Sequence, residues 1–302
     1  MKRLFRFVLG LLLIVPLFAC AAHYSLSGRN PVPVQPDGTL RVATMNVHYI
    51  VLRRASGAWS VADWERRRGP MTAAFKAVNA DIMALQESES FGGGSMSGVN
   101  LTLDALLQDN PGYRAAAVGA PSVFPSTQPI LYRADRLRVE DQGWFFFSDT
   151  PDVIYSRTFN GSWPAFASWA QFTDVQTGAV FRVVNVHFEY RSRSNRRLSA
   201  ALVRDRIAPW ITAGEEVFVV GDLNALRGSA THGLIEEAGV AFAPVRGSTY
   251  HFNRGLNLFG AIDHLGHTDG IAPRTAPVVL RERFEGEWPT DHYPVFADFD
   301  LR

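Results

Sequence analysis

The sequence is poor in cysteine and has almost no net charge, and both shortages exclude classes of protein. Of its 302 residues only Cys20 is a cysteine, which excludes an internal disulfide framework. Because Cys20 lies in the N-terminal segment, the rest of the chain offers no thiolate for a metal site or for nucleophilic catalysis. The formal net charge is +1, so the overall basic excess that is typical of duplex-DNA binders is missing.

Three motifs that mark other enzyme and nucleotide-binding classes are also absent. No His-Glu-x-x-His pair occurs, which disfavours a zinc protease. No Gly-x-Ser-x-Gly elbow occurs, which disfavours a serine hydrolase. The glycine-rich stretch 91–98 has no following Lys-Ser/Thr, so we interpret it as a rim loop and not as a phosphate-binding loop.

The first residues are predicted to direct the protein out of the cytoplasm. Basic residues precede an apolar run from Phe7 to Phe18, and small residues follow it, which is the layout of a secretory signal. The ending Leu17-Phe-Ala-Cys20 resembles a bacterial lipobox, in which the cysteine is lipidated and becomes the mature N-terminus. We therefore predict a signal peptide over residues 1–22 and membrane attachment through Cys20.

Two alternatives stay open for this segment. One is ordinary cleavage near Ala19 to Ala22, and the other is an uncleaved anchor, since a spanning helix needs roughly 17–25 apolar residues. All three place the protein outside the cytoplasm, as a membrane-anchored lipoprotein or as a periplasmic or secreted protein. Residues 23–38 are proline-rich without periodicity, which predicts an extended tether before a domain over residues 39–302.

Short apolar runs that suit buried strands recur through residues 39–302, and helical patterns lie between several of them, as in an α/β layered domain. The expected strands are Leu40–Val47, Asp81–Leu85, Pro129–Tyr132, Phe166–Phe172, Val180–Val186, Val217–Val220, Ala261–Leu265 and Tyr293–Phe299. The expected helices include Met71–Asn79 and Leu198–Ile211.

Polar side chains stand where these runs end. Any one of them alone is well explained as a turn residue or as a structural histidine. Together they would form a ring at the carboxyl ends of the strands, where ligands of open α/β sheets collect. Such a ring of oxygen ligands suits Mg²⁺, which takes one or two carboxylates and keeps several waters. The residues are Asn46, Glu87, His187, Asp222, Asn224 and Asp263, with Asp291 and His292 before the last run.

The order of these residues resembles the endonuclease/exonuclease/phosphatase superfamily, which includes pancreatic-type deoxyribonucleases, abasic-site endonucleases, inositol polyphosphate 5-phosphatases and neutral sphingomyelinases. The resemblance spans residues 41–299 and implies a four-layer sandwich, with two mixed β-sheets packed face to face between helices. The matching segments are Thr44-Met-Asn46, Leu85-Gln-Glu87, Asn185-Val-His187, Gly221-Asp-Leu-Asn224-Ala, Ile262-Asp263-His264 and Thr290-Asp291-His292-Tyr-Pro-Val.

The resemblance also implies a metal site. Glu87 would be the principal carboxylate ligand of Mg²⁺, or of Mn²⁺ in its place, with Asn46 beside it. Asp291 joins the metal shell in some members of the family. His48 stands where some relatives carry a further acidic ligand, so one metal and two metals both stay open.

The catalytic roles that the resemblance implies fall on five residues. Asp222 would orient or deprotonate the attacking water, and Asn224 would help to hold the phosphate. His187 would donate a hydrogen bond to a phosphate oxygen. Asp263 would fix the tautomer of His292, as a buried carboxylate does in other catalytic dyads.

One partner is left open by the sequence. Some relatives pair the equivalent of His187 with a carboxylate, and only Glu189 and Gln128 stand near the matching positions here.

The sequence indicates the substrate less directly than it indicates the site residues. A basic run containing Arg191, Arg193 and Arg196 follows His187 and either grips phosphates at the rim or is ordinary solvated surface. We predict a monomeric, Mg²⁺-dependent phosphodiesterase that acts on nucleic acid or on a phospholipid headgroup. The alternatives are a phosphomonoesterase for small molecules and an inactive surface binding module.

Overall fold

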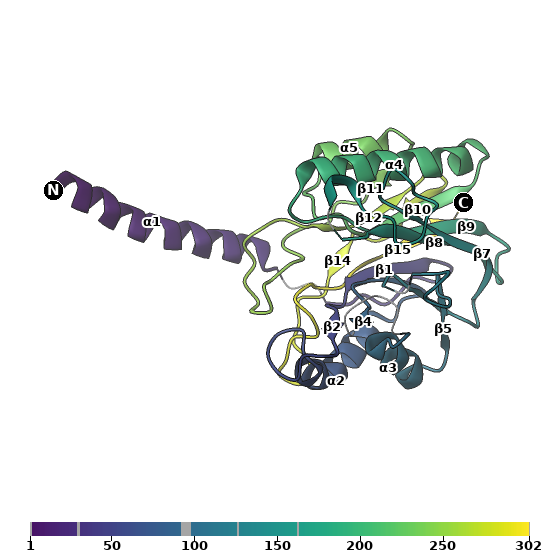
Figure 1. The fold of residues 1–302 in the computed structure, drawn as a ribbon, viewed down its shortest axis with the longest axis horizontal. Coiled ribbons are helices and arrows are strands. Elements are labelled where there is room, and N and C mark those ends of the chain that lie inside the picture. Colours follow the sequence, from purple (N-terminus) through teal and green to yellow (C-terminus); the bar gives the residue numbers. More distant parts are fainter. Residues whose placement is uncertain (1, 29–30, 92–97, 126, 162, 302) are drawn as a thin grey trace.

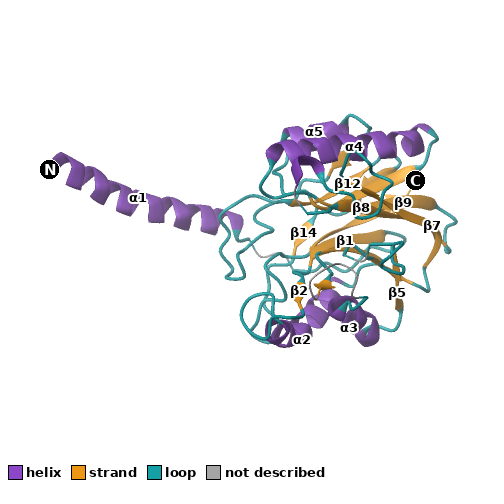
Figure 2. Cartoon of the chain, in the orientation of Figure 1, coloured by secondary structure: helices purple, strands orange, loops and turns teal. Residues whose placement is uncertain are grey.

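The computed structural model describes residues 2–28, 31–91, 98–125, 127–161 and 163–301, so most of the glycine-rich stretch lies outside the described residues. Two mixed β-sheets pack face to face, and helices cover both outer faces (Figure 1). Figure 2 shows the layers, with strands in the middle and helices outside them. The predicted four-layer α/β sandwich is confirmed.

The first sheet is built around a parallel pair, β1 and β3, in which Asn46 stands opposite Gln86. The other described strand pairs of this sheet are antiparallel. The strand order is β13-β15-β1-β3-β6-β5, with β14 also paired to β15. These strands are β1 (Leu40–Asn46), β3 (Ile82–Gln86), β5 (Tyr113–Ala116), β6 (Ile130–Arg133), β13 (Ile271–Pro273), β14 (Val278–Val279) and β15 (Val295–Leu301).

The second sheet repeats this plan around the parallel pair β9 and β10, in which His187 stands opposite Asp222. Its strand order is β11-β12-β10-β9-β8-β7, and a separate short pair joins β2 to β4. These strands are β7 (Leu137–Phe146), β8 (Phe166–Asp174), β9 (Val180–His187), β10 (Glu216–Asp222), β11 (Ala241–Phe242), β12 (Asp263–His267), β2 (Ile50–Val51) and β4 (Ser90–Phe91).

All eight runs predicted as strands fall on strands of the two large sheets. The prediction missed β7, whose middle carries the exposed residues Glu140, Asp141 and Gln142. This strand lies at the edge of its sheet, where one side of the strand is free to carry charge. Its pattern is therefore not that of a buried apolar run.

The core between the sheets comes from alternate side chains of the central strands. Val42 and Ile82 of the first sheet pack there with Val183 and Val220 of the second. The intervening residues of β1, such as Met45, point outward and pack with the residues of α2. This period of two is what a sheet buried on both faces requires.

The helices begin earlier than the sequence patterns predicted. Ser60 caps α2 (Val61–Val78) by accepting a hydrogen bond from the backbone N–H of Asp63, and Ser192 caps α4 (Arg193–Thr212) in the same way. Charged residues are frequent near both starts, at positions 63 and 65–68 of α2 and 193, 196 and 197 of α4, so the apolar periodicity there was weak, whereas the serine caps mark the true starts. The other helices are α1 (Lys2–Leu26), α3 (Leu101–Asp109), the short 3₁₀ helix Phe159–Gly161 and α5 (Ala230–Glu236).

The N-terminal segment differs in part from the predicted tether. Residues 23–26 belong to α1, which extends away from the sandwich (Figure 1). The residues after it are bound to the domain: the carbonyl of Pro33 accepts from Arg41, and the amide of Gln35 donates to Asp81. No helix within the described residues combines the length and the apolarity needed to cross a membrane.

Arg41 on β1 and Asp298 on β15 form a buried ion pair between neighbouring strands. Nε and Nη2 of the arginine donate to the two carboxylate oxygens at 2.7 and 3.1 Å, and both side chains are almost fully buried. Loss of one partner would leave an uncompensated charge in the interior, which costs far more than the loss of an exposed pair.

Asp298→Asn is therefore expected to lower the free energy of unfolding by about 3–5 kcal/mol in urea denaturation. Asp300→Asn is the matched control, because Asp300 lies on the same strand in an exposed pair with Arg274 at 3.9 Å. The control should change the free energy by less than about 1 kcal/mol. Equal losses in the two variants would show that burial of the pair is not what matters.

Candidate active site

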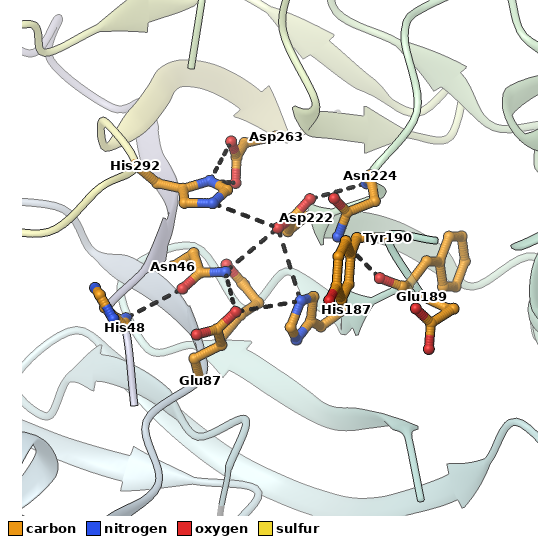
Figure 3. Close-up of polar contacts among 12 residues, drawn as sticks. Asn46, His48, Glu87, His187, Glu189, Tyr190, Asp222, Asn224, Asp263 and His292 are labelled. Carbon is orange, nitrogen blue, oxygen red and sulfur yellow. Dashed lines mark hydrogen bonds and ion pairs between the residues drawn. The ribbon is translucent and has the colours of Figure 1, made fainter. Parts of the chain in front are cut away.

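The two parallel strand pairs bring polar residues of both sheets to one edge of the sandwich. Asn46 ends β1 and Glu87 follows β3, while His187 ends β9 and Asp222 ends β10. Figure 3 shows these four side chains pointing toward one another. The sequence-based expectation that they gather at the carboxyl ends of the strands agrees with this geometry.

Buried amides hold the two sheets together directly beneath these residues. The amide nitrogen of Gln86 donates to the side-chain oxygen of Asn185 at 2.7 Å, and Asn185 donates to the carbonyl of Leu85 at 2.8 Å. Thr44 donates to Gln86 from the neighbouring strand. Since these groups are fully buried, breaking one hydrogen bond would leave an unsatisfied polar group. The network therefore fixes how the two sheets meet.

Asn46 connects the two carboxylates that approach from opposite sheets. Its amide nitrogen lies 3.1 Å from Oε1 of Glu87 and 3.3 Å from Oδ2 of Asp222, and its oxygen accepts from the backbone N–H of His48. The amide oxygen is thus engaged away from the carboxylates. Asn46 is at the predicted place, but in this arrangement it presents a nitrogen to them; its role as a metal ligand stays a prediction.

His187 faces the same two carboxylates. Its Nε2 lies 3.6 Å from Oε1 of Glu87 and 3.7 Å from Oδ2 of Asp222. The sequence left open which carboxylate lies next to His187. These distances show that Glu87 and Asp222 both do. Gln128 instead donates to the backbone carbonyl of Asn185.

His292 links Asp263 to Asp222. Its Nδ1 lies 3.0 Å from an oxygen of Asp263, and its Nε2 lies 3.8 Å from Oδ2 of Asp222. Burial by itself disfavours the imidazolium, but the carboxylate of Asp263, supported by Asp222 and Asp291, outweighs it and holds the pKa of His292 well above its usual value. The pair predicted from the resemblance is therefore in contact, and its surroundings favour the imidazolium form of His292.

Asp222 has an unfavourable environment for a carboxylate. Burial and the neighbouring carboxylate of Asp263 raise its pKa to about 6, although His292 and His187 act in the opposite direction. A bound cation would relieve this repulsion, because a metal ion is the largest local charge where it binds. The donor set in this part of the molecule therefore fits a divalent cation.

Two groupings of side chains offer ligands to such a cation. Asp222, Asp263 and His292 have ligand atoms within 4.8 Å of one another. The hydrogen bond between His292 and Asp263 already occupies two of these ligands, however, and Glu87 as the principal ligand stays a prediction. Its carboxylate is 22% exposed, which leaves room for water and phosphate oxygens, as Mg²⁺ requires.

Asp291 and His48 lie on the Glu87 side of the site. Nδ1 of His48 is 3.6 Å from the carboxylate of Asp291. Burial raises the pKa of the Tyr49 and Tyr250 hydroxyls, and the charges of Glu87 and Asp291 raise it further. The pKa of His48 is lowered because it is buried, and the nearby carboxylates do not offset this. A neutral imidazole thus occupies the position where some relatives carry an acid.

Local backbone geometry explains the Gly-Asp-Leu-Asn sequence at the end of β10. A Cβ on Gly221 would lie 2.0 Å from the carbonyl oxygen of Val186, and its φ is +140°, so only glycine fits beside β9 here. Asn224 then adopts a left-handed conformation. Its backbone N–H donates to Asp222 and its side chain donates to the carbonyl of Phe188. The asparagine therefore holds the carboxylate of Asp222 and the next loop in place, and its contact with a phosphate stays a prediction.

The predicted basic run lies beside this loop. Arg196 donates to the carbonyls of Glu189 and Tyr190, both at 2.8 Å, and burial lowers its pKa, an effect that the charges of Glu189 and Asp222 only partly offset. The guanidinium of Arg191 lies over the ring of Tyr190, 5.1 Å from its centre. Arg193 is exposed at the start of α4. Arg196 thus braces the site edge, and phosphate binding by the three arginines stays a prediction.

Aromatic rings at the rim were not predicted as part of the site. Tyr49 stacks on Trp59 with ring centres 6.1 Å apart, and Tyr250 lies 5.0 Å from the ring of His292. Tyr190, which follows His187 by three residues, is exposed (both are labelled in Figure 3). Tyr49 and Tyr190 each stand within four residues of a sequence motif of the site. Tyr250 lies in a loop that folds back onto the site, and only the fold shows this.

Comparison with known proteins agrees with this geometry. The model of the endonuclease/exonuclease/phosphatase family matches residues 43–292. The chain belongs to this family. Members of the family are hydrolases that act on phosphate esters and typically depend on a divalent metal ion. By sequence, no curated protein matches the chain.

Several solved structures share the fold of this family member. A family protein from Bacteroides vulgatus is 24% identical, with a TM-score of 0.72 over 87% of this chain and 99% of the other. A mannosyl-6-phosphatase from Bacteroides thetaiotaomicron is 21% identical, with a TM-score of 0.71 over 86% and 99%. The human Nocturnin catalytic domain is 16% identical, with a TM-score of 0.62 over 89% and 97%.

Asp263→Asn is expected to move the pH profile of kcat/KM to lower pH. The substitution removes the carboxylate that favours the imidazolium of His292, so the pKa of His292 falls. Activity that needs the imidazolium is lost as the pH rises through this pKa, so the alkaline limb should shift to lower pH. The acid limb should move the same way, because Asp263 also raises the pKa of Asp222. An unmoved alkaline limb in a folded variant would contradict the dyad.

Proposed function

We propose that this family member is a phosphodiesterase that uses Mg²⁺ or Mn²⁺ and an Asp/His-assisted attack of water. The observation that supports the proposal is the meeting of acidic and imidazole groups from both sheets at one edge. Nε2 of His187 and Nε2 of His292 both lie within 4 Å of Oδ2 of Asp222, at 3.7 and 3.8 Å. The base Asp222 and the two hydrogen-bond donors His187 and His292 thus meet at one point, and the carboxylate of Glu87, which would hold the cation, lies beside His187.

Glu87, with Asn46 and Asp291 beside it, would hold the cation. When bound, the cation neutralises the charge of the phosphate and makes a water molecule more acidic. Asn46 can serve as a ligand only if its amide rotates, since its oxygen now accepts from His48. Glu87 therefore contributes more to cation binding than Asn46 does.

The residues of the chain account for the proton movements. The Asp222 carboxylate takes a proton from water as the water oxygen bonds to phosphorus. The phosphorus–oxygen bond to the leaving group breaks at the same time, and the leaving oxygen receives the proton held by Asp222 by way of solvent water, which yields an alcohol and a phosphomonoester. The imidazolium of His292 and the Nε2–H of His187 donate to the phosphate oxygens, where negative charge gathers. Asp263 keeps His292 charged throughout.

One feature favours a phosphodiester over a phosphomonoester. The rings of Tyr49, Trp59 and Tyr250 border the carboxylates on the rim. Such rings can pack against a second group attached to the phosphate.

A phosphomonoesterase is the second candidate. The fold resembles that of the mannosyl-6-phosphatase, although a likeness at this identity carries the fold alone. An inactive binding module is less well supported, because the acid, the base and the metal-fitting carboxylate are all present.

A substrate panel with and without metal tests the proposal. The panel contains bis-p-nitrophenyl phosphate, p-nitrophenyl phosphate, plasmid DNA, RNA, sphingomyelin and phosphatidylinositols. We expect Mg²⁺-dependent turnover of diesters that exceeds turnover of the monoester. Faster cleavage of p-nitrophenyl phosphate would favour the second candidate, and no turnover of any ester would support the binding module.

Asp222→Asn should reduce kcat by about 10²–10⁴-fold, because a positioned base is lost. The carboxamide keeps the size of the side chain, so the variant should fold, which circular dichroism checks. Asp300→Asn is the matched control at an exposed position and should leave kcat unchanged. Full activity in a folded Asp222→Asn variant would refute the assigned role.

A further inference from the structure

Exposed apolar side chains gather on the loop of residues 243–262, which joins β11 to β12. Phe252, Leu256 and Phe259 are 36%, 40% and 53% exposed. Leu226, which is 51% exposed, adjoins them, because a Cβ on Gly260 would lie 3.2 Å from its side chain. A patch of this kind marks an interaction surface more often than scattered single residues do.

The same loop is basic and holds no acid. Residues 238–262 contain Arg246 and Arg254 and no Asp or Glu, and both arginines and Arg227 are exposed. Two acidic side chains of the neighbouring segment face elsewhere: Glu287 pairs with Arg66 of α2, and Glu285 approaches Gly69. Apolar side chains among basic ones suit an anionic lipid surface.

The loop is also where the N-terminal helix joins the domain. The backbone N–H of Asn257 donates to Nδ1 of His23 at 3.1 Å, and its side chain donates to Ser27 at 2.8 Å. The carbonyl of Leu26 accepts from the backbone of Ser248. Figure 1 shows the end of α1 beside this loop. The last turn of α1 is therefore fixed to the loop.

This junction places Cys20 close to the apolar patch. Cys20 lies three positions before His23 on α1, which is about 4.5 Å along the axis at the rise of an α-helix. Cys20 is exposed, and the apolar side chains of Leu17 and Phe18 before it are 68% and 72% exposed. A lipid on Cys20, or an apolar segment before it, would bring a bilayer to the loop.

Aromatic rings connect the patch to the active site. The ring of Phe259 lies 5.8 Å from that of Phe252, which lies 4.5 Å from that of Tyr250. Tyr250 in turn contacts His292 at 5.0 Å. A surface that covers Phe259 and Phe252 therefore lies next to the rim where an ester would enter.

We propose that the loop of residues 243–262 is a membrane-contact surface that, together with the end of α1, sets the rim of the candidate active site against an anionic bilayer. The contact goes beyond the proposed phosphodiesterase activity and does not depend on which ester is cleaved. Its test reads lipid contact and not turnover, so either proposal can fail without the other.

The test uses the full chain with Cys20→Ser, which removes the native thiol, and an environment-sensitive fluorophore on Phe259→Cys. The matched control carries the label on Val175→Cys, an exposed position at the turn between β8 and β9, away from the active-site edge. Vesicles contain phosphatidylcholine with or without phosphatidylglycerol, and some lipids carry a quencher on the acyl chain.

With anionic vesicles, emission from the label at position 259 should rise severalfold, shift to the blue and be quenched by the labelled lipid. The label at position 175 should keep its aqueous emission, and binding to phosphatidylcholine alone should be severalfold weaker. An aqueous spectrum at position 259 on vesicles that carry the protein would show that α1 binds alone and would overturn the proposal. So would equal spectra at the two positions, equal binding to both vesicle types, or no binding.

A second variant separates the loop from the helix without a label. Phe252→Ser combined with Phe259→Ser should weaken partitioning to anionic vesicles by about tenfold or more, since two rings lose apolar contact. Val175→Ser should leave partitioning unchanged. Both variants keep α1, so unchanged partitioning in the double variant would contradict a role for the loop. Circular dichroism checks that the exposed substitutions leave the fold intact.

Discussion

The buried amide bridge between Gln86 and Asn185 is the contact on which the active-site geometry depends. Each sheet by itself carries only half of the site, with Asn46 and Glu87 on one and His187 and Asp222 on the other. A hydrogen bond of 2.7 Å between the amides, supported by the carbonyl of Leu85, sets how the halves meet. Because both amides are fully buried, a shift of one sheet against the other would leave polar groups unsatisfied. The buried amide network thus fixes the relative positions of the site residues on the two sheets.

The arrangement also stores unfavourable interactions at the site. Glu87 and His48 adopt left-handed backbone conformations that non-glycine residues seldom adopt. Asp222 and Asp263 are fully buried carboxylates at neighbouring positions of paired strands. The charge of His292 between them compensates only in part, since the pKa of Asp222 stays raised. A cation and a phosphate ester would complete this charge distribution, which is why the site fits a metal-dependent hydrolase better than an inert binding surface.

The fold was predictable because the strand runs were short and apolar and the site motifs followed them in a recognisable order. Asp263 and His292 are 29 residues apart, and the resemblance paired them, which the distance of 3.0 Å agrees with. The sequence did not predict that Asn46 offers its nitrogen to both carboxylates, since this depends on the backbone turn at His48. Nor did it predict the rings of Tyr49 and Tyr250 at the rim, which long loops bring to the site. The prolines and the lack of periodicity also did not predict that residues 23–28 are partly helical and hydrogen-bonded to the domain.

The central claim is that side chains from the two sheets bind one divalent cation with Glu87 as the principal ligand. Titration of the metal-free protein with Mn²⁺, followed by electron paramagnetic resonance of the free ion, tests it directly. The account predicts a saturable site in the wild-type protein whose affinity falls at least about tenfold in Glu87→Gln, because a carboxylate ligand is lost. Equal Mn²⁺ affinity in wild type and in a folded Glu87→Gln variant would contradict it.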